Sequence, residues 1–289
     1  MAAMTPRLYQ PAVPDRGSTA GGSIAGRSTA GSSIAEGGTP GVDTTGGDAA
    51  CGYAVGASIA LDDGNRHHAG RVLRLAAGAV VELFDGAGHA ALARLADGPG
   101  GRAGFAAIER LLPPEPEPPV RLTLAQAISA ADRMDWTIEK AVELGVAAIV
   151  PLQSERGVVR LDRERSARRL AHWHRIIVAA CAQCRRNRLP ALAPVTTLND
   201  WLAAALPAQR RWMLDPEADA SLASLAANAG TDTEQALLCG PESGFSDAER
   251  RCAVAAGCRP ARLGPRVLRT ETAGVAALAV LQGLLGDLR

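Results

Sequence analysis

The chain has 289 residues, 47% of them hydrophobic, which is enough for two domains with their own cores. Its 31 basic and 30 acidic residues nearly cancel, so the net charge alone indicates no nucleic-acid partner. It has no uninterrupted apolar run of membrane-spanning length and no signal pattern at its N-terminus, which argues against a membrane protein. We therefore expect a cytoplasmic protein with reduced cysteines.

Residues 1–112 are predicted to form a small β-barrel. Alternating runs indicate strands at 57–61, 80–84, 90–95 and 104–111, and Arg7-Leu8-Tyr9 is a short structured piece before them. Asp63-Gly64 and Asp85-Gly86 are turn signals, and residues 71–74 form a short helix or turn. Gly, Ser, Thr and Ala dominate residues 14–56, which cannot bury enough apolar surface to fold. This insertion is therefore predicted to be disordered.

The proline-rich segment 113–119 is predicted to be a stiff linker between two domains. After it, strands and helices alternate. Strands are expected at 120–127, 147–152, 211–214, 236–239 and 261–263, and helices at 134–142, 170–184, 198–206, 222–227 and 271–285. This alternation predicts an α/β domain over residues 120–289 with a largely parallel sheet.

Ten arginines lie between residues 156 and 188, against only two acidic residues, Asp162 and Glu164. This segment carries a local positive charge that the net charge of the whole chain does not reveal. Either a solvated helix face or a nucleic-acid contact explains it. His172, His174, Cys181 and Cys184 in the same segment do not predict a metal site. On one helix the two histidines point about 200° apart, so one ion cannot bind the whole set.

Two glycine-bearing loops are the strongest candidates for a ligand site. Residues 240–246 follow a buried strand and precede a helix that begins with a capping box, Ser246 to Glu249. Residues 263–273 join a short strand to an apolar final helix. Ligands bind at the carboxyl ends of parallel strands, although a tight turn without a ligand remains an alternative. The first loop lacks the lysine of a P-loop, and Ser243 stands one place late for a nucleophile elbow.

Several segments in order along the chain resemble the bacterial small-subunit ribosomal RNA uracil-N3 methyltransferases of the SPOUT class. The resemblance covers residues 5–13 and about 57–289, and the two C-terminal loops are its most specific part. The other matching segments are 66–68, 71–74, 132–136, 139–146, 151–156, 172–173 and 183–190. The family usually has glycine where this chain has Ser243, and serine fits there unless the position needs a positive φ.

The resemblance implies a PUA-like N-terminal β-barrel and a SPOUT α/β domain with a deep trefoil knot. It also implies a homodimer that uses S-adenosylmethionine and no metal to methylate N3 of a specific uridine in 16S ribosomal RNA, within the 30S subunit. The cofactor-binding residues would be Leu214, Gly240, Pro241, Glu242, Gly244, Leu263, Gly264, Leu268, Thr270, Thr272 and Ala273. A non-catalytic RNA-binding or ribosome-assembly module on the same fold is the alternative.

Two residues are predicted to act in catalysis. Arg269 would stabilise the negative charge that spreads onto the uracil carbonyl oxygens when N3 loses its proton, or it would instead cap a backbone carbonyl. Glu242 would orient donors or accept that proton, or it would instead bond to amides of its own loop. Phosphate contacts are predicted for Arg7, Arg74, Arg156, Arg186 and Arg188.

Overall fold

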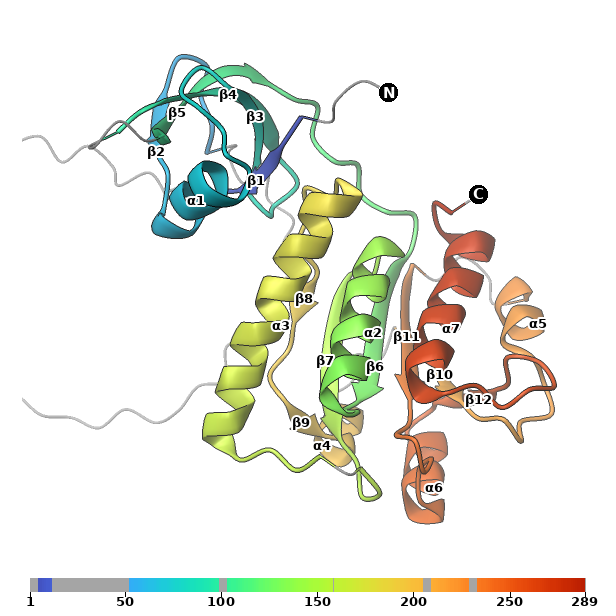
Figure 1. The fold of residues 1–289 in the computed structure, drawn as a ribbon. Helices are drawn as coiled ribbons and strands as arrows, with labels where there is room; N and C mark the ends of the chain where they lie inside the picture. Colours follow the sequence, from blue (N-terminus) through green and yellow to red (C-terminus); the bar gives the residue numbers. More distant parts are fainter. Residues whose placement is uncertain are drawn as a thin grey trace, which may run out of the picture.

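The computed structural model of the chain describes residues 5–11, 52–98, 103–157, 159–204, 209–228 and 233–288. Its strands form two separate sheets, one of five strands near the N-terminus and one of seven strands after it (Figure 1). Residues 113–118 run between the two sheets without helix or strand. Residues 14–56 are predicted from the sequence to be disordered, and this segment lies outside the described residues as far as Cys51. Residues 52–56 are described and Tyr53 is buried, so the prediction is wrong for this end of the segment.

The first sheet has the strand order β1-β3-β4-β5-β2, with β1 parallel to β3 and the other pairs antiparallel. Its strands are β1 (Arg7–Tyr9), β2 (Ser58–Ala60), β3 (Val80–Phe84), β4 (Ala90–Asp97) and β5 (Ala103–Leu111). Val81, Leu83, Ala91, Ala93 and Ile108 are buried together in its core. The strands predicted from alternating hydrophobicity are therefore confirmed.

One turn prediction in this domain is wrong. Asp63-Gly64 begins helix α1 (Asp63–His67), which continues into a π-helix, η1 (His68–Val72). Asp62 is the N-cap residue, and its carboxylate accepts a hydrogen bond from the Asn65 amide at 2.7 Å. Asp and Gly favour turns and helix starts alike, so only the cap contact distinguishes the two structures.

The two ends of the insertion meet in this domain. Tyr53 is 3% exposed and packs in the barrel core, and its hydroxyl donates a hydrogen bond to the carbonyl of Gln10. The chain on either side of residues 12–51 is therefore held together by contacts that do not involve them.

Removing residues 16–52 should leave the fold intact. Residues 11–15 then join Gln10 to Tyr53, which shortens the loop about eightfold. The free-energy cost of closing this loop falls by about 2 kcal/mol at most, and this change stabilises the folded state. We expect a melting temperature equal to or above that of the full chain, measured by differential scanning calorimetry. A clearly lower melting temperature would show that the insertion contributes to folding.

The second sheet has the order β12-β10-β11-β6-β7-β8, with β9 beside β7, and every pair is parallel. Its strands are β6 (Arg121–Ala127), β7 (Ala148–Gln153), β8 (Ala191–Leu192), β9 (Thr196–Thr197), β10 (Arg210–Leu214), β11 (Glu234–Cys239) and β12 (Arg259–Ala261). Leu122, Leu124 and Leu237 are fully buried in it. The predicted α/β domain with a parallel sheet is confirmed.

Helices cover both faces of this sheet. They are α2 (Ala131–Glu143), α3 (Arg163–Cys184), α4 (Leu198–Ala203), α5 (Leu222–Ala227), α6 (Asp247–Ala255) and α7 (Thr270–Leu285). Helices α3, α2 and α7 lie side by side over one face, and α4 and α6 pack on the other (Figure 1). Helix α2 ends at Gly145, which has a φ of 75°, as the sequence predicts. None of the described helices is long and apolar enough to cross a bilayer.

A buried ion-pair cluster joins the two sheets. Arg7 is 7% exposed; its Nε donates to Glu82 at 2.8 Å and its Nη1 to the carbonyl of Cys181 at 3.0 Å. Arg185, which follows α3, reaches the other oxygen of Glu82 at 2.7 Å. The barrel is therefore fixed to the end of α3 by charged groups from both domains.

Two of the arginines predicted to contact phosphate are engaged in the protein instead. Arg7 is enclosed in the cluster just described, so its guanidinium cannot reach an RNA strand. Arg186 donates to the carbonyls of Val142 and Val146, both at 3.0 Å, and so caps the C-terminal end of α2. These two predictions are wrong because each residue satisfies buried acceptors.

Candidate active site

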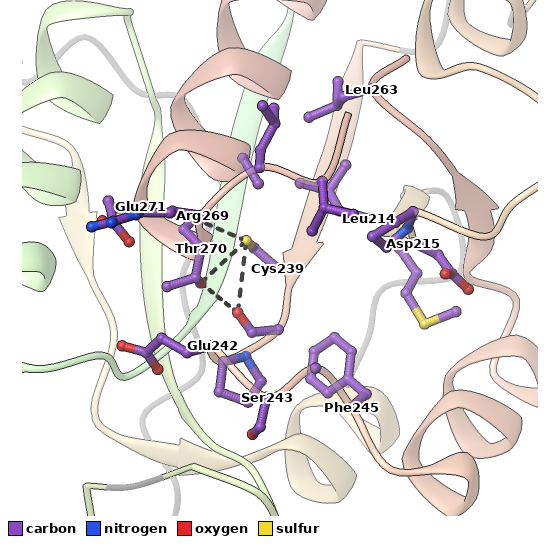
Figure 2. A pocket seen from close by; sticks show the side chains of 18 of the residues that line it. Leu214, Asp215, Cys239, Glu242, Ser243, Phe245, Leu263, Arg269, Thr270 and Glu271 are labelled. Atoms are coloured by element: carbon purple, nitrogen blue, oxygen red, sulfur yellow. Dashed lines mark hydrogen bonds between the residues drawn. The ribbon is translucent and has the colours of Figure 1, made fainter. Parts of the chain in front are cut away.

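The two glycine-bearing loops meet and line one cavity of about 630 Å³ (Figure 2). The loop after β11 contributes residues 240–245, and the loop after β12 contributes residues 263, 266–271 and 273. Met213, Leu214 and Asp215, at the carboxyl end of β10, form a third wall. The cavity therefore lies where neighbouring parallel strands end, as the fold leads one to expect.

Thr270 ties the two loops together. It is the first residue of α7, and its hydroxyl donates to the carbonyl of Gly240 (Figure 2). The same hydroxyl accepts a hydrogen bond from Gln126 Nε2 at 2.9 Å. The Cys239 thiol donates to the Thr270 carbonyl at 3.5 Å. Helix α7 approaches β6 closely here, since a Cβ on Gly274 would lie 2.8 Å from Gln126 Oε1. These contacts fix the second loop against the first.

Backbone conformation explains the glycines in the loops. Gly244 has a φ of 69° and Gly264 a φ of 101°, both in the left-handed region that favours glycine. Ser243 is not among the residues with positive φ, and its hydroxyl donates to the carbonyl of Arg156 at 2.9 Å. Serine therefore fits at this position, where the resembling family usually has glycine.

Charged groups converge at one side of the cavity. Arg133, on α2, donates to Glu242 Oε1 at 2.8 Å, and its Nε lies 4.0 Å from Glu271. Arg269 is exposed and, among the described residues, meets no acceptor. The structure thus provides a free guanidinium beside an oriented carboxylate. Among the described residues, Arg269 caps no backbone carbonyl and Glu242 bonds to no amide of its own loop, so the alternative roles of these two residues are not seen.

The opposite side of the cavity carries a second charged pair. Asp215 is 7% exposed and forms an ion pair with Nη2 of Arg250, whose Nη1 lies 3.3 Å from Glu217. The cavity therefore has carboxylates at both ends and apolar side chains, such as Leu214 and Leu263, between them (Figure 2).

The buried cysteines are not suited to nucleophilic chemistry. Burial raises the pKa of Cys239, which lines the cavity, to about 11, so its thiol stays protonated at neutral pH. Burial likewise raises the pKa of Cys181, which packs in the core of the second domain, to about 12. The described residues contain no cluster of three or more His, Cys, Asp or Glu placed to hold a metal ion.

Comparisons with known proteins match this architecture. A model described as an RNA methyltransferase domain matches residues 116–282, and one described as an RNA methyltransferase PUA domain matches residues 61–103. Ribosomal RNA small subunit methyltransferase E from Buchnera aphidicola is 30% identical over 79% of this chain and 89% of its own length. Its counterpart from Mycobacterium bovis is 33% identical over 78% of this chain and 87% of its own. This chain belongs to the ribosomal RNA small subunit methyltransferase E family.

Two solved structures extend the family likeness over the whole chain. A putative methyltransferase from Legionella pneumophila, solved with bound S-adenosylmethionine, is 33% identical with a TM-score of 0.79, covering 99% of this chain and 100% of that one. A methyltransferase E from Neisseria gonorrhoeae, also solved with the cofactor, is 31% identical with a TM-score of 0.77 and the same coverage. The predicted PUA-like barrel and SPOUT domain are confirmed, and the trefoil knot stays a prediction.

The cavity of this family member brings together most of the residues predicted for cofactor binding and catalysis. They are Leu214, Gly240, Pro241, Glu242, Gly244, Leu263, Leu268, Arg269, Thr270 and Ala273. Gly264 and Thr272 are not among the residues that line it, and their contact with the cofactor stays a prediction. Gly264 shapes the turn through its positive φ, and Thr272 is exposed on the first turn of α7.

Several polar or aromatic cavity residues were not predicted as site residues. They include Arg133, Asp215, Phe245, Arg250, Arg266 and Glu271. Asp215 follows a predicted strand directly, so the rule that ligands bind at carboxyl strand ends could have found it. Arg133 and Arg250 reach the cavity from helices, and no local pattern marks them.

The remaining arginines predicted to contact phosphate have different surroundings. Arg156 lines the cavity, and its Nη1 donates to the carbonyl of Phe245 at 3.4 Å. Arg74 is exposed in the barrel with a φ of 53°. Arg188 is partly exposed and lies 2.9 Å from Glu117. Their contact with RNA stays a prediction.

Proposed function

We propose that this family member transfers a methyl group from S-adenosylmethionine to N3 of a specific uridine in 16S ribosomal RNA. The observation that carries the proposal is the single cavity formed by the two glycine-bearing loops. Residues 1–112 would act as the RNA-binding barrel, residues 113–119 as the linker, and residues 120–289 as the methyltransferase domain. The work would take place in the cytoplasm, where small subunits are made.

The residues of the cavity suit this cofactor. A volume of about 630 Å³ lies within the range of small-molecule sites. Leu214, Leu263 and Leu268 offer apolar surface for an adenine ring, and the carboxylates of Asp215 and Glu242 offer acceptors for hydroxyl or ammonium groups. When bound, S-adenosylmethionine supplies a methyl group on a positively charged sulfur.

The residues of the chain supply positioning and electrostatics for the acceptor base. The uracil N3 must lose a proton, and the resulting negative charge spreads onto the flanking carbonyl oxygens. The free guanidinium of Arg269 can donate to one of these oxygens, and this bond strengthens as the charge develops. Glu242 is the candidate acceptor of this proton, and Arg133, at 2.8 Å, orients its carboxylate at the edge of the cavity.

A second copy of the chain is proposed to cover the cavity. Val267, on the second loop, is 80% exposed, and Trp136, one turn along α2 from Arg133, is 41% exposed. Large apolar side chains at the rim of a site favour burial against another protein surface. Sedimentation should therefore give the mass of a homodimer, and a monomer at micromolar concentration would contradict this part of the proposal.

Methyl transfer to 30S subunits that lack the modification tests the function. We expect one methyl group per subunit, located at N3 of one uridine of the 16S RNA by nuclease mapping and mass spectrometry. Free 16S RNA, tested in parallel, shows whether the assembled particle is required. Binding of S-adenosylmethionine without transfer to either substrate would favour the non-catalytic module.

A further inference from the structure

A second cavity lies at the N-terminal end of α3, away from the candidate active site. Its volume is about 530 Å³, and its lining is mainly cationic. The lining residues are Val159, Arg160, Leu161, Arg165, Arg168, Arg169 and His172. The site residues predicted from the sequence include none of these.

The spacing along α3 places three arginines and His172 on one helix face. Positions 165, 168, 169 and 172 follow the i, i+3, i+4, i+7 pattern, so their side chains stack along a single stripe. Like charges at such spacing destabilise an isolated helix by a few tenths of a kcal/mol per pair. A basic stripe that lines a cavity is therefore an arrangement that a bound anion would stabilise.

Neighbouring acids neutralise this stripe only in part. Asp162, the N-cap residue, lies 3.4 Å from Arg165, and Glu164 forms an exposed ion pair with Arg168. Asp135 on α2 lies 2.7 Å from His172 Nε2. Arg169 meets no carboxylate among the described residues. The N-terminal end of a 22-residue helix adds its own positive potential.

The chain connects this cavity directly to the first one. Arg156 lines the first cavity and Arg160 the second, and the two residues are four positions apart, which is at most about 14 Å of extended chain between their Cα atoms. Both ends of this segment make hydrogen bonds, because the Glu155 amide donates to Glu249 at 2.7 Å and Arg160 donates to the Glu155 carbonyl at 2.8 Å. The two cavities therefore lie a short distance apart along the chain.

We propose that the arginine cavity binds backbone phosphates of the RNA strand that flanks the target base. A guanidinium group can form bidentate hydrogen bonds with phosphate oxygens. Several arginines that line one concave surface can therefore hold an RNA strand in a fixed register. Phosphate contacts position an RNA without reading its sequence, so this site would set where along the strand the first cavity acts. The inference rests on the proposed function for its choice of RNA.

The double variant R165Q/R169Q tests the proposal, with R121Q/R251Q as the matched control. Arg121 on β6 and Arg251 on α6 are exposed and lie outside the barrel and both cavities, so both variants lose two positive charges. Affinity for an unmodified 16S RNA transcript is measured by fluorescence anisotropy at several salt concentrations. We expect R165Q/R169Q to bind about tenfold more weakly and to lower the slope of log affinity against log salt by about 1.4, and the control to match the parent.

Further measurements separate this proposal from its alternatives. R165Q/R169Q should retain the S-adenosylmethionine affinity of the parent and melt at an equal or higher temperature, because like-charge repulsion is relieved. R165K/R169K should keep most of the salt slope. An unchanged slope in R165Q/R169Q, or an equal loss in the control, would overturn the proposal. A parent that binds RNA with this slope but methylates no 30S subunit would instead contradict the proposed function.

Discussion

Replacing Arg269 by alanine is expected to lower the rate of methyl transfer about 10²–10³-fold, which is the usual cost of losing one donor to a developing oxyanion. The guanidinium is exposed at the cavity and meets no acceptor among the described residues, so its removal breaks no contact of the fold. Single-turnover transfer to unmodified 30S subunits measures the chemical step, and calorimetry measures the affinity for S-adenosylmethionine. The affinity should stay within about twofold of the parent, since the loss belongs to the transition state.

Arg266→Ala is the matched control for this prediction. Arg266 is an exposed arginine of the same loop and also lines the cavity, so it reports the loss of a charge without the proposed donor. We expect a much smaller loss of rate than for Arg269→Ala. Equal rates for Arg269→Ala and the parent would remove Arg269 from the mechanism, and a parallel loss of cofactor affinity would make it a binding residue.

Replacing Glu82 by alanine is expected to destabilise the protein by about 3–5 kcal/mol, the typical cost of leaving a buried charge without its partner. The side chains of Glu82 and Arg7 are 6% and 3% exposed, and Arg185 shares the same carboxylate. Without Glu82, the guanidinium of Arg7 remains buried between the barrel and α3. Urea-induced unfolding followed by circular dichroism measures the change.

The control for this change is Glu109→Ala. Glu109 pairs with Arg94 at 2.6 Å, but both side chains are more than two-fifths exposed, at 41% and 49%. An exposed pair of this kind contributes only about 0–1 kcal/mol. Similar destabilisation by Glu109→Ala and Glu82→Ala would show that the cluster around Arg7 does not hold the two domains together.

The sequence predicts the main strands and helices because their signals are local. A continuous apolar run marks β7 and the second half of β11, alternating apolar residues mark β6, and a helical stripe marks α3. Strands β8 and β9 have two residues each, which is too short for any period to appear. The roles of Arg7 and Arg186 were also inaccessible, because Glu82 lies 75 residues from Arg7 and the α2 carbonyls lie about 40 residues from Arg186.

The sequence predicts the part of the candidate site that the backbone of the two loops forms. Glycines next to predicted strand ends located both loops, and Gly244 and Gly264 adopt the left-handed conformation that such turns need. The side chains that complete the cavity come from elsewhere in the chain. Arg133 meets Glu242 across 109 residues and Arg250 meets Asp215 across 35 residues, and only the packing of α2 and α6 brings these pairs together.

A crystal structure of the chain grown with S-adenosylmethionine tests the central claim most directly, namely that the loops after β11 and β12 form one pocket for the methyl donor. We predict electron density for the cofactor between residues 240–245 and 263–273, with its methyl group directed toward the side that carries Arg269 and Glu242. Density for the cofactor elsewhere on the molecule, with this cavity filled by side chains or solvent, would contradict the account.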